Sequence, residues 1–197
     1  VFDNANQSLF GIVQGGEYED LRRHCVEELV KLDFDGYSIG GTSVGEDKPT
    51  QYKMVRYATK YLPKDKVRYL MGVGDPIDIV ENVCNGVDIF DCVSPTRLAR
   101  HGHALTRYGK INIKNAKYKE DFTPIEKGCT CYACTNYTKA YIKHLINCEE
   151  TFGARLLSIH NIHYLINLTE ELRSAIKEDR LLAYREEFIK NYYGNSK

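Results

Sequence analysis

Several common sequence signals are missing from this chain, and each absence excludes a class of protein. No apolar run approaches the roughly 20 residues that a membrane-spanning helix needs, so no membrane span is expected. The first residues, VFDNANQS, have neither the basic start nor the apolar centre of a secretory signal peptide. Net charge is also zero, because 27 Lys and Arg residues balance 27 Asp and Glu residues. Any affinity for nucleic acid must therefore come from a local basic patch.

The sequence also lacks the even, regularly spaced cysteines of a disulfide framework, since its cysteines number seven. This pattern favours a reducing cytoplasm, with some of the thiols bound to a metal. The cysteines outside the metal motif are expected to be small core residues: Cys25, Cys84, Cys92 and Cys148. A starting Met is missing as well, and we therefore expect the sequence to be a fragment of a longer chain.

The first half alternates short apolar runs with amphipathic stretches. The runs predict strands at residues 8–13, 37–39, 67–71 and 87–93, the last burying Val87, Ile89, Phe90 and Val93. The stretches predict helices at residues 21–32, 49–61 and 76–84, the first burying Leu21, Cys25, Leu29 and Leu32. Apolar strands that alternate with helices indicate an α/β fold with a parallel sheet, either open or part of a (β/α)8 barrel. Four strands cannot close such a barrel, so a barrel would require another half.

Potentially reactive residues lie at the carboxyl ends of these strands. They are Gln14, Gly40 and Gly41, Met71 and Gly72, and Asp91. Ligands bind at the carboxyl ends of strands in α/β sheets and barrels. Ser94 and Pro95 cannot continue the strand that precedes Asp91, and the chain then becomes basic at Arg97 and Arg100. The stretch indicates acid chemistry on a phosphate-bearing molecule, or alternatively an edge strand with a capping aspartate.

The second half begins with a basic segment. Residues 97–119 contain no Asp or Glu, while Tyr108 and Tyr118 lie among seven basic residues: Arg97, Arg100, Arg107, Lys110, Lys114, Lys117 and Lys119. A basic segment that contains aromatic residues is typical of a nucleic-acid contact. A solvated hairpin that turns at residues 108–110 is the alternative.

Three cysteines then follow within six residues, at Cys129, Cys131 and Cys134. Zn²⁺ requires a fourth nitrogen or sulfur ligand, for which the candidates are Cys148, His144, His160 and His163. We choose His160, on a segment that can fold back across the preceding helix. A Cys₃His site has no open position for water and would be structural. Free thiols in a loop are the alternative.

The remaining residues predict helices at 135–152, 162–176 and 181–192. The first of these would place Tyr137, Tyr141, His144 and Leu145 on one face, which suits either a core or a subunit contact. We expect three regions: the barrel units with the nucleophile strand at 1–106, the basic segment and metal subdomain at 107–160, and packing helices at 161–197.

These motifs together resemble the carboxyl-terminal half of bacterial tRNA-guanine transglycosylases. The resemblance covers essentially all 197 residues, and the motifs that carry it are FGIVQGG at 10–16, GYSIGGTSVGE at 36–46, RYLMGVGDPIDI at 68–79, GVDIFDCVSPTRLARHGHALT at 86–106, CTCYAC at 129–134 and HN at 160–161. It implies half of an irregular (β/α)8 barrel with an inserted zinc-binding subdomain. It also implies a cytoplasmic homodimer that replaces guanine at the wobble position of a tRNA anticodon with a 7-deazaguanine, in queuosine biosynthesis.

The resemblance assigns roles to individual residues. Asp91 would be the nucleophile that attacks ribose C1′. The base would contact Gln14, the backbone of Gly41, and Met71. The RNA-contacting residues would be Gly72, Val73, Gly74, Asp75, Pro76, Ile77 and Asp78, with Thr96, Arg97, Leu98, Ala99 and Arg100. One structural Zn²⁺ per chain would be held by Cys129, Cys131, Cys134 and His160.

Some features depart from the family pattern. The second catalytic aspartate and the rest of the base pocket belong to an amino-terminal half that this sequence does not contain. Thr42 stands where Leu is more usual in bacterial members, whereas Val44 resembles them, so the choice between prequeuine and queuine stays open. The alternative function is a non-catalytic, zinc-containing tRNA-binding or accessory subunit.

Overall fold

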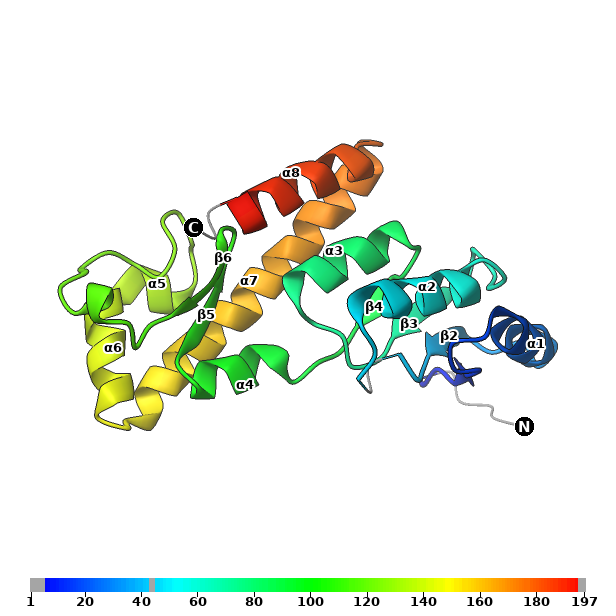
Figure 1. The fold of residues 1–197 in the computed structure, drawn as a ribbon, viewed down its shortest axis with the longest axis horizontal. Coiled ribbons are helices and arrows are strands. Elements are labelled where there is room, and N and C mark those ends of the chain that lie inside the picture. Colours follow the sequence, from blue (N-terminus) through cyan, green and yellow to red (C-terminus); the bar gives the residue numbers. More distant parts are fainter. Residues whose placement is uncertain (1–5, 43–44, 195–197) are drawn as a thin grey trace. The chain divides into compact units, whose positions relative to one another are not determined.

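The structure is a computed structural model that describes residues 6–42 and 45–194. The chain forms two compact units, Val1–Cys92 and Val93–Lys197. Each unit contains its own cluster of buried apolar side chains. Figure 1 shows the helices and strands of both units and labels most of them.

The first unit contains a four-stranded parallel sheet whose strands follow the order of the chain. The strands are β1 (Phe10–Val13), β2 (Gly36–Ile39), β3 (Val67–Leu70) and β4 (Ile89–Phe90). They alternate with the helices α1 (Glu19–Val30), α2 (Lys48–Thr59) and α3 (Pro76–Cys84). The expected α/β fold with a parallel sheet is therefore confirmed.

Helix α3 begins where its sequence predicts. The side chain of Asp75 accepts a hydrogen bond from the backbone N–H of Ile77, and Pro76 occupies the first turn. Proline fits there because the first N–H groups of a helix have no partner within the helix. The cap fixes the end of the loop that follows β3, and so limits how far this loop can move at the sheet edge.

The buried face of α1 differs from the expected one. Arg22 and Val26 are buried, whereas Leu21 is 50% exposed and Leu32, beyond the helix end, is 67% exposed. The other two residues of the expected face are half-buried. The spacing of apolar residues therefore predicted the wrong buried face for α1. Arg22 can lie in the interior because its guanidinium donates hydrogen bonds to backbone carbonyls.

Strand β4 is shorter and more exposed than expected. It covers two residues, and it pairs with β3 through Ile89 and Phe90. Val87 is buried, but Ile89 is 45% exposed and Val93 is 58% exposed. The expectation of a fully buried strand is wrong at these two positions, because β4 is the last strand of the described sheet and has a partner on one side.

The second unit surrounds one long helix, α7 (Thr151–Lys177). Its other elements are α4 (Ser94–Arg100), β5 (His103–Thr106), β6 (Gly109–Asn112), the 3₁₀ helix η1 (Ala116–Tyr118), α5 (Tyr132–Asn136), α6 (Lys139–Asn147) and α8 (Leu181–Gly194). Leu156 and Leu157 of α7 pack with Ile142 and Ile113 in a fully buried core. Among the described residues, no helix has both the length and the apolarity that crossing a membrane requires.

The basic segment contains the hairpin that was considered as the alternative interpretation. Strands β5 and β6 are antiparallel, and Thr106 pairs with Gly109 at the turn. The hydroxyl of Thr106 donates a hydrogen bond to the Gly109 carbonyl at 2.6 Å, and Gly109 has a φ of +99°, which glycine adopts without strain. The seven basic side chains of residues 97–119 are exposed, so the hairpin does not bury the basic residues of this segment.

The helices of the second unit correct three expectations. The stretch 135–152 is interrupted twice, because α5 ends at Asn136 and α6 ends at Asn147. Glu149 reverses the chain with a φ of +57°, a conformation that sequence periodicity does not reveal. Helix α7 then runs without a break through residues 158–161, which were expected to form a separate segment, and the boundary expected at 160 falls inside it. Cys148, expected in the core, is exposed beside this turn.

Candidate functional site

The strand-end residues of the first unit lie in one row. Val13, Ile39, Leu70 and Phe90 are the last residues of their strands, and they occupy matching register positions across the sheet. The residues that follow them therefore share one edge: Gln14, Gly40, Met71 and Asp91. The structure brings together the four strand ends that the sequence singled out.

Asp91 is exposed at this edge and is held in place by two donors. The hydroxyl of Tyr69 donates a hydrogen bond to its Oδ1 atom at 2.6 Å, and the backbone N–H of Gly72 donates another at 2.9 Å. These bonds favour the charged carboxylate and lower the pKa of Asp91 below its ordinary value. The same contact raises the pKa of Tyr69 to about 12. The site therefore presents an ionised, positioned carboxylate at neutral pH.

The side-chain amide of Gln14 lies against Gly40 and Gly41. A Cβ atom on Gly40 would come within 2.5 Å of its Nε2 atom, and one on Gly41 within 2.8 Å of its Oε1 atom. Gly41 also has a φ of +63°, which side chains other than glycine rarely adopt. The double glycine thus allows the backbone to approach an exposed amide. Val44 lies outside the described residues.

Two residues that the sequence analysis did not single out support this edge. Tyr69 of β3 donates to Asp91, and Arg22 of α1 bonds to the loops after β1 and β2. Burial lowers the pKa of Arg22, although a guanidinium remains charged in proteins. The sequence offered a partial signal for Tyr69, because strands predicted at 67–71 and 87–93 could pair, and the observed register sets Tyr69 opposite Ile89, two residues before Asp91. Arg22 gave no such signal, since an arginine on a helix is usually exposed.

The first segment expected to contact RNA is only partly exposed. Gly72 and Asp75 are exposed, whereas the other five members of residues 72–78 are buried: Val73, Gly74, Pro76, Ile77 and Asp78. Asp78 is 3% exposed, forms an ion pair with Lys48, and accepts a 2.7 Å hydrogen bond from Tyr52. Its carboxylate therefore faces the interior of the first unit.

The second such segment is a short helix. Residues 94–100 form α4, where Arg97 and Arg100 are exposed and Ala99 is buried. Leu98 and Thr96 are half-buried, and the hydroxyl of Thr96 donates to the Val93 carbonyl. The helix therefore exposes two guanidinium groups to solvent, while its opposite side packs against the protein.

The predicted metal ligands converge in the second unit. The sulfur atoms of Cys129, Cys131 and Cys134 and a ring nitrogen of His160 all lie within 4.8 Å of one another. Nδ1 of His160 is 3.7 Å from the sulfurs of Cys129 and Cys131, and 3.4 Å from that of Cys134. Tetrahedral Zn²⁺ places such sulfur and nitrogen atoms about 3.6 Å apart, from its bond lengths. The donor set and its spacing therefore fit one metal ion.

The imidazole of His160 is fully buried and oriented by its second nitrogen. Nε2 lies 2.7 Å from the Leu105 carbonyl, so a neutral ring keeps its proton on Nε2 and offers Nδ1 to a cation. Hydrogen bonds with Cys134 lower the pKa of Cys131 to about 3. Burial opposes the charge on His160, yet hydrogen bonds with Cys129 and Cys131 raise its pKa to about 9. A hydrogen bond with Cys131 and burial raise the pKa of Cys134, so without an ion the cluster favours a thiolate at Cys131, the form that binds metals.

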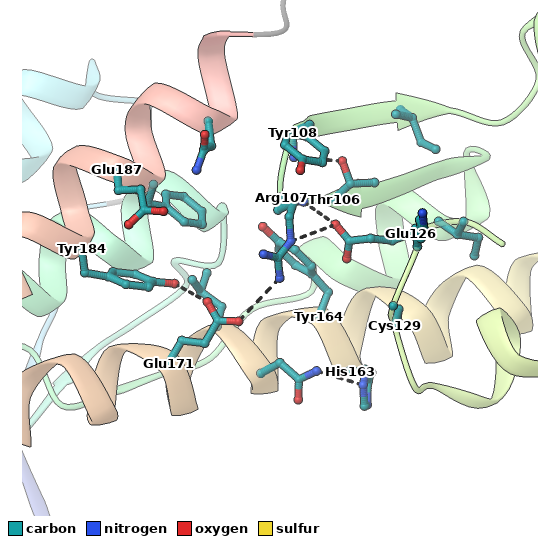
Figure 2. A pocket seen from close by; sticks show the side chains of 18 of the residues that line it. Thr106, Arg107, Tyr108, Glu126, Cys129, His163, Tyr164, Glu171, Tyr184 and Glu187 are labelled. Atoms are coloured by element: carbon teal, nitrogen blue, oxygen red, sulfur yellow. Dashed lines mark hydrogen bonds and ion pairs between the residues drawn. The ribbon is translucent and has the colours of Figure 1, made fainter. Parts of the chain in front are cut away.

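A pocket of about 830 Å³ lies among β5, β6, α7 and α8 of the second unit (Figure 2). Arg107 lies between two carboxylates there, 3.8 Å from Glu126 and 3.7 Å from Glu171. Tyr184 donates a 2.7 Å hydrogen bond to Glu171. These charged groups pair with one another, a pattern that fastens the hairpin to α7 and α8.

The expected aromatic face survives the change in helix boundaries. Tyr137 precedes α6, but its ring stacks on Tyr141 at 5.5 Å and meets Phe152 edge-on. Tyr141 is 42% exposed and His144 is exposed, whereas Leu145 is buried. The rings therefore contact one another in a surface patch that lies above the buried Leu145.

Comparisons with known proteins show the family of the chain. The model of one family, described as queuine tRNA-ribosyltransferase, matches residues 2–194. Queuine tRNA-ribosyltransferases of Staphylococcus aureus strains JH9, JH1 and USA300 are each 57% identical over 187 residues, which is 95% of this chain and 49% of the relative. The chain thus spans about half the length of the relatives it matches. Because the family match extends along nearly the whole chain, the chain belongs to the queuine tRNA-ribosyltransferase family.

Proposed function

We propose that the complete protein replaces guanine at the wobble position of a tRNA anticodon with a 7-deazaguanine, either prequeuine or queuine, in queuosine biosynthesis. The observation that carries the proposal is Asp91, an ionised and exposed carboxylate fixed at the same sheet edge as Gln14 and Gly41. Membership of a family named for ribosyl transfer to tRNA supports this chemistry.

In the proposed reaction, Asp91 is the nucleophile. Both of its hydrogen bonds end on Oδ1, so we assign the attack on ribose C1′ to Oδ2. The bond from C1′ to guanine N9 breaks, and guanine leaves with the electron pair and takes up a proton. N9 of the incoming base then loses its proton, bonds to C1′ and displaces the carboxylate. The proton-transfer group belongs to the amino-terminal half that the family resemblance implies.

The base would bind between the strand ends. The amide side chain of Gln14 and the backbone N–H of Gly41 would hydrogen-bond the purine edge, and Met71 would pack on its face. Because a base cannot react inside a stacked helix, the target guanosine must swing out of the anticodon loop to reach Asp91.

The RNA backbone would meet both segments named by the resemblance. Arg97 and Arg100 would bind phosphates directly, as exposed guanidinium groups on α4. In residues 72–78, exposed Gly72 and Asp75 would touch the RNA, and the buried members would hold the shape of the loop. The basic hairpin would extend this electrostatic surface.

We propose Zn²⁺ as the ion of the Cys₃His cluster, one per chain. The four protein ligands complete its tetrahedral shell, so its contribution is structural. It would tie the loop of Cys129, Cys131 and Cys134 to α7 through His160. Zinc suits this site because three thiolates and one imidazole are its usual structural donors.

The complete assembly is part of the same proposal. The parallel sheet would be half of an irregular (β/α)8 barrel, completed by an amino-terminal half that contributes the second aspartate. Two copies would associate through the patch of Tyr137, Tyr141 and His144. We place the protein in the cytoplasm, where tRNA is found and cysteines stay reduced.

The test is exchange of radiolabelled guanine into tRNA by the complete protein. Asp91→Ala should abolish exchange, together with the covalent RNA adduct seen on a denaturing gel. Asp88→Asn is the matched control, because Asp88 is exposed on the same segment and accepts a backbone hydrogen bond from Arg68 that Asn can also accept. Normal exchange by Asp91→Ala would refute the nucleophile. A wild-type protein that binds tRNA without forming an adduct would support the accessory-subunit alternative.

A further inference from the structure

Arg22 is an unusual residue in the first unit, because its charged side chain is 0% exposed. Its guanidinium donates from Nε to the Gly16 carbonyl at 2.7 Å. It donates from Nη2 to the carbonyls of Gly40 and Gly41, at 3.2 and 3.3 Å. One side chain thus joins the loop after β1 to the loop after β2. Removing a charged group from water is unfavourable, and the three hydrogen bonds to backbone carbonyls offset that loss of hydration.

These two loops contain the groups assigned to the base. Gln14 lies two residues before Gly16, and the Gly41 backbone is itself a partner of Arg22. In a trans peptide the C=O and N–H groups point in opposite directions. When Arg22 draws the Gly40 carbonyl towards α1, the N–H of Gly41 must therefore point away from α1.

We propose that Arg22 is a positioning residue for the base site: its buried guanidinium fixes the Gly41 N–H relative to the Gln14 amide. This inference rests on the proposed function, which assigns both groups to the purine. Arg22 acts through these groups and does not touch the base. Its forked donors suit the task because they reach carbonyls of two loops from one rigid plane, which a lysine ammonium on a flexible stem cannot reproduce.

The experiment measures guanine exchange by the complete protein with Arg22→Lys and Arg22→Met. If one hydrogen bond to the base is lost or misdirected, the KM for guanine should rise about tenfold. The KM for tRNA should change less than about twofold, because its phosphate contacts lie elsewhere. Arg22→Lys should be less affected than Arg22→Met, since it keeps one donor group.

The matched control is Arg23→Met. Arg23 is the next residue of α1, but its side chain is 52% exposed and forms an ion pair with Glu27 at 3.7 Å. Its removal should leave both KM values unchanged. Thermal unfolding of each variant shows what fraction is folded, and a reduced folded fraction lowers kcat without moving either KM.

Three results would overturn the proposal. The KM for guanine could stay normal in both Arg22 variants, kcat could fall while both KM values hold, or neither variant could fold, which would assign Arg22 to stability alone. The proposed function fails separately, if the wild-type protein exchanges no guanine. Wild-type exchange with normal Arg22 variants would therefore reject only this inference.

Discussion

Asn161 offers the sharpest test of how the second unit is held together. Its side chain is fully buried on α7. It accepts a hydrogen bond from the Leu105 N–H at 2.8 Å, and it donates to the carbonyls of Pro95 at 2.9 Å and His103 at 3.1 Å. One amide thus joins β5 and the start of α4, which presents Arg97 and Arg100, to α7.

Asn161→Ala removes all three bonds between this amide and the backbone of α4 and β5. At about 1 kcal/mol for each bond, the loss is about 3 kcal/mol, a large part of a typical free energy of unfolding. A loss of about 3 kcal/mol should make the locally unfolded state of β5 and α4 roughly 100-fold more populated. Backbone amide hydrogen exchange measured under native conditions reports this population.

The matched control is Asn167→Ala on the same helix, where Asn167 is exposed and its amide contacts only His163 among the hydrogen bonds described. A surface change of this kind is expected to alter exchange by about twofold at most. If Asn161→Ala accelerates exchange of the β5 amides no more than Asn167→Ala does, the reasoning about buried amide partners is refuted.

Three further predictions test other parts of the site. Tyr69→Phe removes the hydrogen bond that favours the charged carboxylate, so the pKa of Asp91 should rise. In a pH profile of kcat/KM, the activity lost as the pH is lowered should then be lost at a higher pH than in the wild type. An unchanged acidic side of the profile would contradict this. Cys131→Ser should reduce bound zinc from about one ion per chain to almost none by metal analysis, whereas the exposed Cys148→Ser should retain it; equal zinc in both would argue against the cluster. Tyr141→Ala should weaken a dimer in native mass spectrometry, and an intact dimer would exclude the aromatic patch.

The sequence predicted the parts of the fold that depend on local patterns. Apolar runs predicted the four strands. Parallel pairing then placed Gln14 and Asp91 on the same edge of the sheet, because the carboxyl ends of parallel strands meet at one edge. Spacing alone identified the three cysteines of the metal cluster. His160 was a choice among four candidates, and the structure confirms the grouping because α7 turns that residue inward.

What the sequence did not predict depends on partners that are distant along the chain. Arg22 is buried because carbonyls from two loops receive its hydrogen bonds, and Asp78 is buried because Lys48 and Tyr52 reach it from α2. The break before α7 depends on a left-handed Glu149. None of these features changes the apolar periodicity, so a pattern of hydrophobic positions cannot reveal them.

The continuity of α7 limits how this region can change in evolution. His160 contributes to the metal cluster, Asn161 joins α4 to β5, and Tyr164 lines the pocket, all on one uninterrupted helix. A single inserted residue rotates everything beyond it by about 100°. An insertion or deletion between residues 161 and 164 would therefore turn Tyr164 away from His160 and Asn161, and one before residue 160 would turn all three away from the amino-terminal part of the helix.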